Sequence, residues 1–594
     1  MRPSNLNRPQ LAKTNRRRSL SALFRIPLST RTPEYPVISA SQAVGSVPAD
    51  IIREVVELLS PADILSFSLT SSAVRAFLIP ALYESVYLRS SRKCRVTLAM
   101  LAKRPDICVH IRKLTVRPNY YLSWPKPDEP LEESWVEYMI GQIAGNLTSL
   151  HTFDWDGLEL PSDRMWGTLR RCCPHLRNIF SNVGSRPLDA NSELFSFSDL
   201  KSFSLIVRYG LDGTELFPPC EPLPATLWDM LRHRCPDLEE LAICSFSPSS
   251  RLLDFLPATE ARWPKLQSLT LGSFGYQNDF TLGPADDESF AEFLNDHPTL
   301  KYMRLQWNFK RWMSPAEMRM ELSPNALPEL DTFVGVYQQL ARLPNPRSIE
   351  TLDLTCEPLH ESRLEVICPI LRTLTSLTSL DLWTHIVHPN QDNTHLFSSI
   401  LSACRGLTDL HFMCTMTFTA KSLKQFISQL YWLPKLEKFS LTKGHKYGDE
   451  TMLESALQIL RAKPTLQQIN IRWAREKAPN HLKQEGTYDI TAIEGEPVYI
   501  MVHEQGIPLV GRAFERRYKY TIGPPSGERS LTPSKLVGDS WPFFFITAVT
   551  AALQPSPSNL LYLHAHASCR LSSTHSVCMA RAFEIILYVG PHRC

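Results

Sequence analysis

The sequence predicts an α/β fold, in which a short cluster of three helices is followed by an elongated array of parallel strands backed by helices. One observation is a six-residue pattern with three apolar positions, which recurs twelve times in the middle of the chain. A second is that amphipathic stretches with helical spacing precede many copies of the pattern. A third is the excess of proline over glycine, 46 residues against 23, which favours rigid stops between short elements.

Composition narrows the function classes. The chain has 594 residues with 63 basic and 60 acidic side chains, so its net charge of +3 indicates neither a nucleic-acid partner nor a membrane surface. The uncharged stretch 540–569 is interrupted at Gln554 and Pro555 and lacks the roughly 18 consecutive apolar residues of a membrane span. The 14 cysteines include no CxxC pair, and we therefore expect a reducing compartment, cytoplasmic and/or nuclear.

Both ends of the chain differ in composition from the middle. Residues 1–33 hold seven arginines, one lysine and no acid, which favours a disordered basic tail over 1–45. A mitochondrial-type presequence, and a nuclear-import or kinase-regulated patch at 16–19, are the alternatives. Residues 523–594 have no sustained periodicity and predict a disordered tail, whose authenticity as coding sequence is open. Its histidines and cysteines match no zinc template, so we expect no metal: His564, His566, Cys569, His575 and Cys578.

Residues 47–80 predict the three helices. An apolar stripe at i, i+4, i+7 and i+8 marks the first: Ile51, Val55, Leu58 and Leu59. Ser60 is a good N-cap for the second helix, with Pro61 at its first position. Thr70-Ser71-Ser72 caps the third, which we expect to end at Pro80. Because so few residues cannot bury a core, some apolar side chains must pack on another domain or another protein. The alternative is that the cluster only caps the following array.

The recurring pattern is an apolar residue, two polar residues, an apolar residue, any residue and an apolar residue. It begins at Ile111, Leu150, Leu176, Leu200, Leu238, Leu266, Leu300, Ile349, Leu377, Leu407, Leu436 and Leu466. The copy at Leu176 is the weakest, because Ser181 occupies its last apolar position. Each copy predicts a turn followed by a short strand whose apolar residues point inward. Before Leu407, an amphipathic run places Phe397, Ile400, Leu401 and Cys404 on one helical face.

A helix, a turn and a short strand in about 24–39 residues resemble the unit of leucine-rich-repeat proteins. The resemblance covers residues 105–475 and implies an irregular solenoid of about twelve degenerate units, with a post-repeat cap over 476–522. A different α/β domain with coincidental LxxLxL strings is the alternative.

The helix cluster is similar to the F-box, to which we assign residues 46–90. The matching positions are Val47-Pro48, Asp50-Ile51, Pro61-Ala62-Asp63-Ile64 and the stretch from Ser68 to Arg75. The segments FLIPALYESVYLRS and VYIMVHEQGIPLVGRAF resemble extensions of fungal F-box proteins. Val47, Ser71 and Val74 replace the usual Leu, Cys and Trp, which predicts a weaker adaptor contact.

The resemblance implies a substrate-recognition subunit of an SCF-type cullin–RING ubiquitin ligase. In that family the F-box binds a Skp-type adaptor and the repeats hold a protein substrate, with no cofactor and no catalysis in the chain. The implied adaptor contacts are Pro48, Ile51, Leu59, Leu65, Leu69 and Val74. A scaffold protein without a ligase role is the main alternative. An enzyme is disfavoured because we find no GxxxxGK[ST], GxSxG or HExxH motif.

The substrate surface follows from strand geometry. On a repeat sheet, the residue between the last two apolar positions faces the concave side, as do residues just beyond the strand. Exposed tryptophan and arginine are common binding anchors. The candidates are Arg304, Trp307, Asp353, Asp381, Trp383, His411 and Arg472.

Overall fold

The computed structural model describes residues 49–119, 130–184, 186–207, 221–245, 253–254, 256–273, 284–306, 321–386, 391–414, 418–445, 450–475, 478–491, 498–506 and 514–522. The tails predicted at 1–45 and 523–594 lie outside these ranges, as do the histidines and cysteines of the C-terminal segment.

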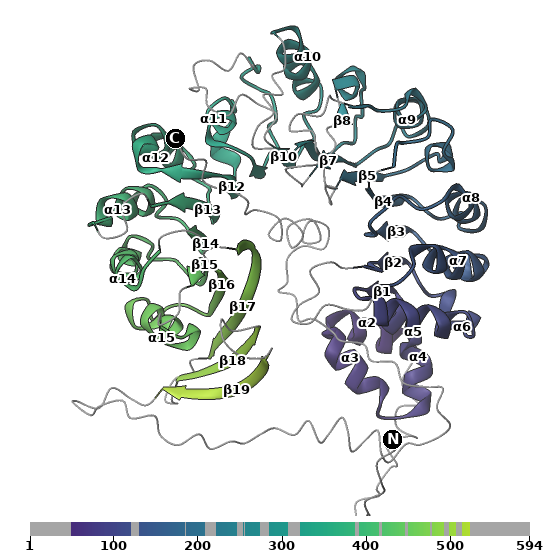
Figure 1. Ribbon diagram of the computed structural model, residues 1–594, viewed down its shortest axis with the longest axis horizontal. Helices are drawn as coiled ribbons and strands as arrows, with labels where there is room; N and C mark the ends of the chain where they lie inside the picture. Colours follow the sequence, from purple (N-terminus) through teal and green to yellow (C-terminus); the bar gives the residue numbers. More distant parts are fainter. Residues whose placement is uncertain are drawn as a thin grey trace, which may run out of the picture.

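The described chain curves into a horseshoe, with one continuous sheet on its inner side and helices on its outer side (Figure 1). Three helices at the N-terminal end lie across the opening from the last strands (Figure 1). The helices are α2 (Ala49–Leu58), α3 (Pro61–Ser68), α4 (Ser72–Tyr83), α5 (Ser91–Leu101), α6 (Pro105–Cys108), α7 (Glu133–Ile143), α8 (Asp163–Cys172), α9 (Ala225–Asp229), α10 (Pro284–Asn295), α11 (Tyr337–Leu340), α12 (Leu364–Thr373), α13 (Thr394–Ala403), α14 (Ala420–Ser428) and α15 (Met452–Ala462).

The large sheet has 17 strands. The parallel strands, each paired with the next along the chain, are β1 (Ser85–Leu88), β2 (Lys113–Val116), β3 (Thr152–Trp155), β4 (Asn178–Val183), β5 (Ser202–Val207), β7 (Glu240–Ser245), β9 (Ser268–Ser273), β10 (Tyr302–Gln306), β11 (Thr332–Val334), β12 (Thr351–His360), β13 (Ser379–His385), β14 (Asp409–Cys414), β15 (Lys438–His445) and β16 (Gln468–Arg475). Three antiparallel strands follow: β17 (Ala478–Thr491), β18 (Val498–Gly506) and β19 (Phe514–Ile522). A separate short pair consists of β6 (Glu221–Pro222) and β8 (Leu253–Asp254).

The register of the sheet explains the recurring apolar pattern. Equivalent apolar residues of neighbouring strands are direct partners: Leu352, Leu380, Leu410, Phe439 and Ile469. All of these side chains are buried. Because side chains alternate along a strand, each pair of core residues leaves the residue between them on the inner face of the horseshoe. A solenoid of parallel strands backed by helices, as predicted, is confirmed.

The helices bury the other side of this core. In α13, Phe397, Ile400 and Leu401 are buried as their spacing predicted. The Phe397 ring makes edge-on contacts with Phe412 of β14 and Phe426 of α14, at centroid distances of 5.9 and 5.3 Å. Each unit therefore packs against its neighbours, which is how a solenoid buries faces that one unit cannot bury alone.

Two strands of the solenoid were not predicted. β1 lies within the segment assigned to the F-box, and its unit begins with Tyr83, a polar-tipped residue in the first apolar position. β11 lies in the long interval between the units at Leu300 and Ile349, and Gly335 occupies its third apolar position. The Gly335 N–H donates to the carbonyl oxygen of Asp353 at 3.0 Å. Backbone pairing thus forms a strand where the side-chain pattern is incomplete.

The expectation that Pro80 ends the third helix is wrong. Pro80 lies inside α4, which continues to Tyr83. A proline removes one helical hydrogen bond but does not forbid continuation when tertiary packing holds the next turn. Here Tyr83 is buried and belongs to the main core, and Leu82 packs against both the main core and the core of the helix cluster.

The last three strands continue the sheet beyond the final repeat. Glu504 of β18 is fully buried, accepts a hydrogen bond from the Tyr488 hydroxyl at 2.5 Å and another from Arg516 Nε at 2.6 Å. Burial, followed by the negative charge of Glu504, raises the pKa of Tyr518 to about 12. These contacts tie β17, β18 and β19 together across the face that continues the solenoid core.

Candidate functional site

The three N-terminal helices have a very small core of their own. Among the described residues, the buried apolar side chains of this core are Ile52, Val74 and Leu78, and the partly buried side chains packed against them are Val56, Ile64, Phe67 and Leu82. Burial of so few apolar side chains leaves little stabilisation for an independent domain. The cluster is therefore held by its junction with the solenoid.

Short polar caps set where the helices begin. Ser60 Oγ accepts the Asp63 N–H at 3.2 Å and donates to the Asp63 carboxylate at 2.6 Å, which starts α3. Ser71 Oγ accepts the Val74 N–H at 3.1 Å, which starts α4. Both N-caps were predicted, and both satisfy backbone donors that a helix leaves unpaired. They fix the residue at which each helix begins.

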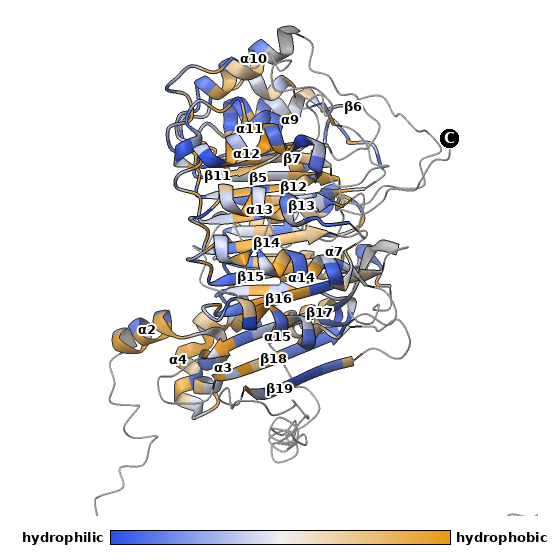
Figure 2. Ribbon diagram, turned by 90° about the vertical axis from the view of Figure 1, so that its left-hand side faces the viewer, coloured by the Kyte–Doolittle hydropathy of each residue, from blue (hydrophilic) through white to orange (hydrophobic). Residues whose placement is uncertain are grey.

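The opposite side of the cluster is apolar and exposed. On α2, the stripe formed by Ile51, Val55 and Leu58 is 47%, 42% and 78% exposed. Leu69 and Phe77 add 65% and 48% exposed side chains after α3 and on α4. Figure 2 shows α2 largely in the apolar colour at the end of the molecule. Several large apolar side chains are thus exposed within 27 residues, and such surfaces are typical of sites where protein partners bind.

The predicted adaptor contacts have different environments. Ile51 and Leu69 are exposed, whereas Leu59 and Leu65 are half-buried. Val74 has no exposed surface and packs in the small core. Pro48 lies outside the described residues.

Three exposed side chains are missing from the predicted set: Val55, Leu58 and Phe77. Val55 and Leu58 belong to the helical stripe of Ile51, so periodicity points to them. Which of two adjacent stripes on α2 faces outward is not encoded in the period. It depends on how α2 packs on α4.

The predicted substrate residues lie on the inner face of the sheet, and most of them are buried there. Trp307 lies outside the described residues, and Asp381 and Arg472 are half-buried. The four others are at most 6% exposed: Arg304, Asp353, Trp383 and His411. The structure therefore brings these residues to one face but gives a binding partner little access to those four.

A polar network connects part of this inner face. Asp353, Asp381 and His411 are direct neighbours on β12, β13 and β14. His411 Nε2 lies 3.0 Å from Thr442 Oγ1, and its Nδ1 lies 3.7 Å from Asp381 Oδ2. Burial raises the pKa of the Asp353 carboxyl, and the charge of Asp381 adds to this effect, while Arg304 opposes it.

An apolar cluster occupies the rest of the same inner region. It contains Tyr302, Val334, Val336, Cys356, Trp383 and Met413. Burial, followed by Asp353, raises the pKa of the Cys356 thiol to about 12, so this thiol is not activated as a nucleophile.

Within the described residues, no group of three or more His, Cys, Asp or Glu side chains is arranged to hold a metal ion. In the same part of the chain, no helix is long and apolar enough to cross a membrane.

Comparisons with known proteins agree with the N-terminal assignment. A family model of the F-box domain matches residues 46–78. Among curated proteins, none matches the sequence. Similar solved structures include the complex of Rad7 and Elc1 in yeast, with 10% identity, a TM-score of 0.36, and coverage of 68% of this chain and 90% of that chain.

Two further structures have a TM-score of 0.25. One is the leucine-rich repeat-containing protein LegL7 from Legionella pneumophila, with 12% identity and coverage of 62% of this chain and 85% of that chain. The other is the TLR13–ssRNA13 complex, with 14% identity and coverage of 66% and 52%. At these scores the likenesses carry no argument about function. The chain contains an F-box domain at residues 46–78, and a solenoid of parallel strands backed by helices follows this domain directly.

Proposed function

We propose that this protein is the substrate-recognition subunit of an SCF-type cullin–RING ubiquitin ligase. Its F-box binds a Skp-type adaptor, and its solenoid holds a protein substrate. The observation that carries the proposal is the exposed apolar surface formed by α2, Leu69 after α3 and Phe77 of α4, located within the segment that matches the F-box family. The protein acts in the cytoplasm or nucleus, where it contributes proximity and leaves the chemistry to other subunits.

The energetics of this face fit a stable partner. Burial of one exposed leucine side chain contributes about 1.5–3 kcal/mol. Leu58, Leu69 and Ile51 are 78%, 65% and 47% exposed, so each gains part of this amount when a partner covers it, and this gain offsets part of the entropic cost of association. A partner that covers these side chains also shields from water the apolar surface that the small core of the helix cluster does not bury.

The junction between the F-box and the solenoid is short. Glu84 follows α4 directly, and β1 begins at the next residue. The carbonyl oxygen of Glu84 accepts the N–H groups of Arg112 and Lys113, both at 2.9 Å, and its carboxylate lies 3.3 Å from Arg112 Nη1. Because no linker separates the two parts, a bound adaptor and a bound substrate are held in one relative orientation, as the proximity mechanism requires.

The test is binding of the full-length chain to a purified Skp-type adaptor. We expect Ile51→Asp and Leu58→Asp each to weaken binding by at least about thirtyfold, because each places a carboxylate in a desolvated contact. Val96→Asp is the matched control, since Val96 is 52% exposed on α5, outside the F-box, and should leave binding unchanged.

If the unmodified chain fails to bind the adaptor, or if the α2 variants bind as tightly as the control, the ligase role is refuted. A scaffold role for the solenoid is then the remaining reading.

A further inference from the structure

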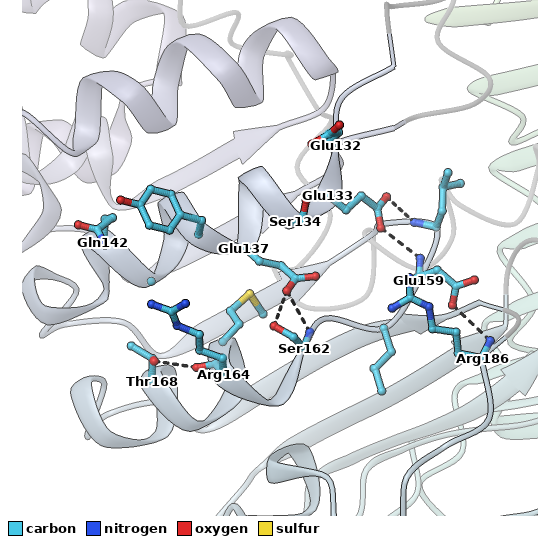
Figure 3. A pocket seen from close by; sticks show the side chains of 15 residues that line it. Glu132, Glu133, Ser134, Glu137, Gln142, Glu159, Ser162, Arg164, Thr168 and Arg186 are labelled. Atoms are coloured by element: carbon cyan, nitrogen blue, oxygen red, sulfur yellow. Dashed lines mark hydrogen bonds between the residues drawn. The ribbon is translucent and has the colours of Figure 1, made fainter.

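A groove lies between α7 and α8, next to the loops that follow β3 and β4 (Figure 3). Its volume is about 700 Å³, within the range of ligand-binding clefts. Leu158 and Leu160, both half-buried, provide apolar surface in it, and Tyr138, which also lines it, is 53% exposed. At Gly141 of α7, an added Cβ would meet nothing within 4 Å, so the helix leaves space beside the groove.

The groove is acidic on its α7 side. Four glutamates line it, at positions 132, 133, 137 and 159, against two arginines at 164 and 186. Figure 3 shows Glu133 and Glu137 side by side on α7, pointing toward the loop after β3. They stand one helical turn apart, a spacing at which like charges repel.

Neutral donors hold these two carboxylates in place. Glu133 accepts the N–H groups of Leu158 and Glu159 at 2.7 and 3.2 Å. Glu137 accepts the Ser162 N–H at 3.1 Å and the Ser162 hydroxyl at 2.5 Å. Burial raises the pKa of Glu133, the neutral donors lower it, and the charge of Glu137 raises it again. A cation that enters the groove relieves the repulsion, and neither carboxylate has to leave its present position.

We propose that this groove binds a segment of the protein substrate in which lysine or arginine stands beside an apolar residue. The basic group lies against Glu133 and Glu137, and the apolar side chain lies on Leu158 and Leu160. Charge complementarity favours segments with lysine or arginine and disfavours acidic or phosphorylated segments. The assignment of the segment to a substrate rests on the proposed ligase function.

The probe is a fluorescein-labelled heptapeptide of alternating leucine and arginine, and its counterpart with glutamate in place of arginine is the control peptide. Fluorescence polarisation with the full-length chain should show binding of the first peptide only, and this binding should weaken as ionic strength rises. We expect Gly141→Trp to lower the affinity at least about tenfold by filling the groove, and Glu137→Gln to lower it about threefold to tenfold.

Gly145→Trp is the matched control, because a Cβ at Gly145 also meets nothing within 4 Å and this residue does not line the groove. If Gly141→Trp binds the peptide like Gly145→Trp, or if both peptides bind equally, the proposal is overturned. Deletion of the basic residues 1–33 gives a further check. If the deletion raises peptide affinity more than about tenfold, the occupant is that segment of the same chain, and the assignment to a partner is wrong.

Adaptor binding, measured on the same variants, separates the two proposals. Gly141→Trp should retain the adaptor, because the groove lies outside the F-box helices. If Gly141→Trp loses peptide binding but the unmodified chain does not bind the adaptor, the ligase function alone is refuted. If Gly141→Trp still binds the peptide and also binds the adaptor normally, the proposed peptide site in the groove alone is refuted.

Discussion

His297 uses both nitrogens of its ring, one for a contact with the preceding repeat and one for a contact within its own repeat. The backbone N–H of Trp263 donates to His297 Nε2 at 3.0 Å, and Nδ1 lies 2.6 Å from the carbonyl oxygen of Phe293. These contacts require a neutral ring with its proton on Nδ1. The side chain is fully buried, and burial lowers its pKa, with a further lowering contribution from Arg262 and opposing contributions from the Phe293 carbonyl and Asp296.

We predict that His297→Leu destabilises the solenoid at pH 7.5 by about 2–4 kcal/mol. The change leaves the buried Trp263 N–H without its acceptor, at a cost of about 1–3 kcal/mol, and removes the net contribution of the second hydrogen bond, about 0.5–1.5 kcal/mol. Urea denaturation measures the loss, and hydrogen exchange of the Trp263 amide reports it locally. His233→Leu is the control, because the His233 side chain is 73% exposed.

The pH dependence has a defined sign. A histidine with a lowered folded-state pKa stays neutral in the folded chain while the unfolded chain takes up a proton below its ordinary value of about 6.5. The stability due to His297 is therefore complete above that value and is lost as pH falls toward the folded-state pKa. The difference between the unmodified chain and His297→Leu should shrink from pH 7.5 to pH 5.5. An unchanged difference, or a variant as stable as the His233→Leu control, would refute the reasoning.

Three further predictions follow from buried groups. Burial and the neighbouring charge of Asp381 raise the pKa of Asp409 to about 6, so its ionised form costs stability at neutral pH. Asp409→Asn should stabilise the chain by about 1–2 kcal/mol at pH 7.5. As pH falls, Asp409 takes up its proton in the folded chain at a higher pH than in the unfolded chain. The stabilisation by Asp409→Asn should therefore vanish near pH 4, and the urea midpoints of both proteins at pH 7.5 and pH 4 measure this. Val74→Trp should destabilise the F-box by about 1–3 kcal/mol and weaken adaptor binding, since Val74 has no exposed surface, and tighter adaptor binding would contradict this. Leu410→Ala should cost about 2–5 kcal/mol because Leu410 is fully buried in the apolar ladder, and a urea midpoint unchanged from that of the unmodified chain would contradict it.

Most of the architecture could be predicted because it depends on local periodicity. Two leucines separated by one residue encode a strand with a buried side, and all twelve predicted units lie on strands of the sheet. Ser60 and Ser71 could be identified as N-caps because capping involves residues only three positions apart. β11 could not, because Gly335 leaves its pattern incomplete and the strand is held by pairing with β12, a contact between distant positions.

The candidate sites were less predictable, since exposure is a tertiary property. The alternation in a strand correctly placed Asp353 and His411 on the inner face, but their burial depends on neighbours in other strands. No sequence motif indicates the groove between α7 and α8, because its residues come from helices and loops that are separated in sequence.

By itself, the sequence determined the repeated strand-and-helix unit, the helix starts in the F-box, and the presence of more apolar surface near the N-terminus than those helices can bury. The tertiary structure decided which surfaces remain available. It placed Val74 in the small core and Leu58 in water, although both are apolar residues of the same 29-residue stretch, 47–75. The physical reason is that periodicity defines the faces of a helix, whereas only packing against other elements selects the face that is covered.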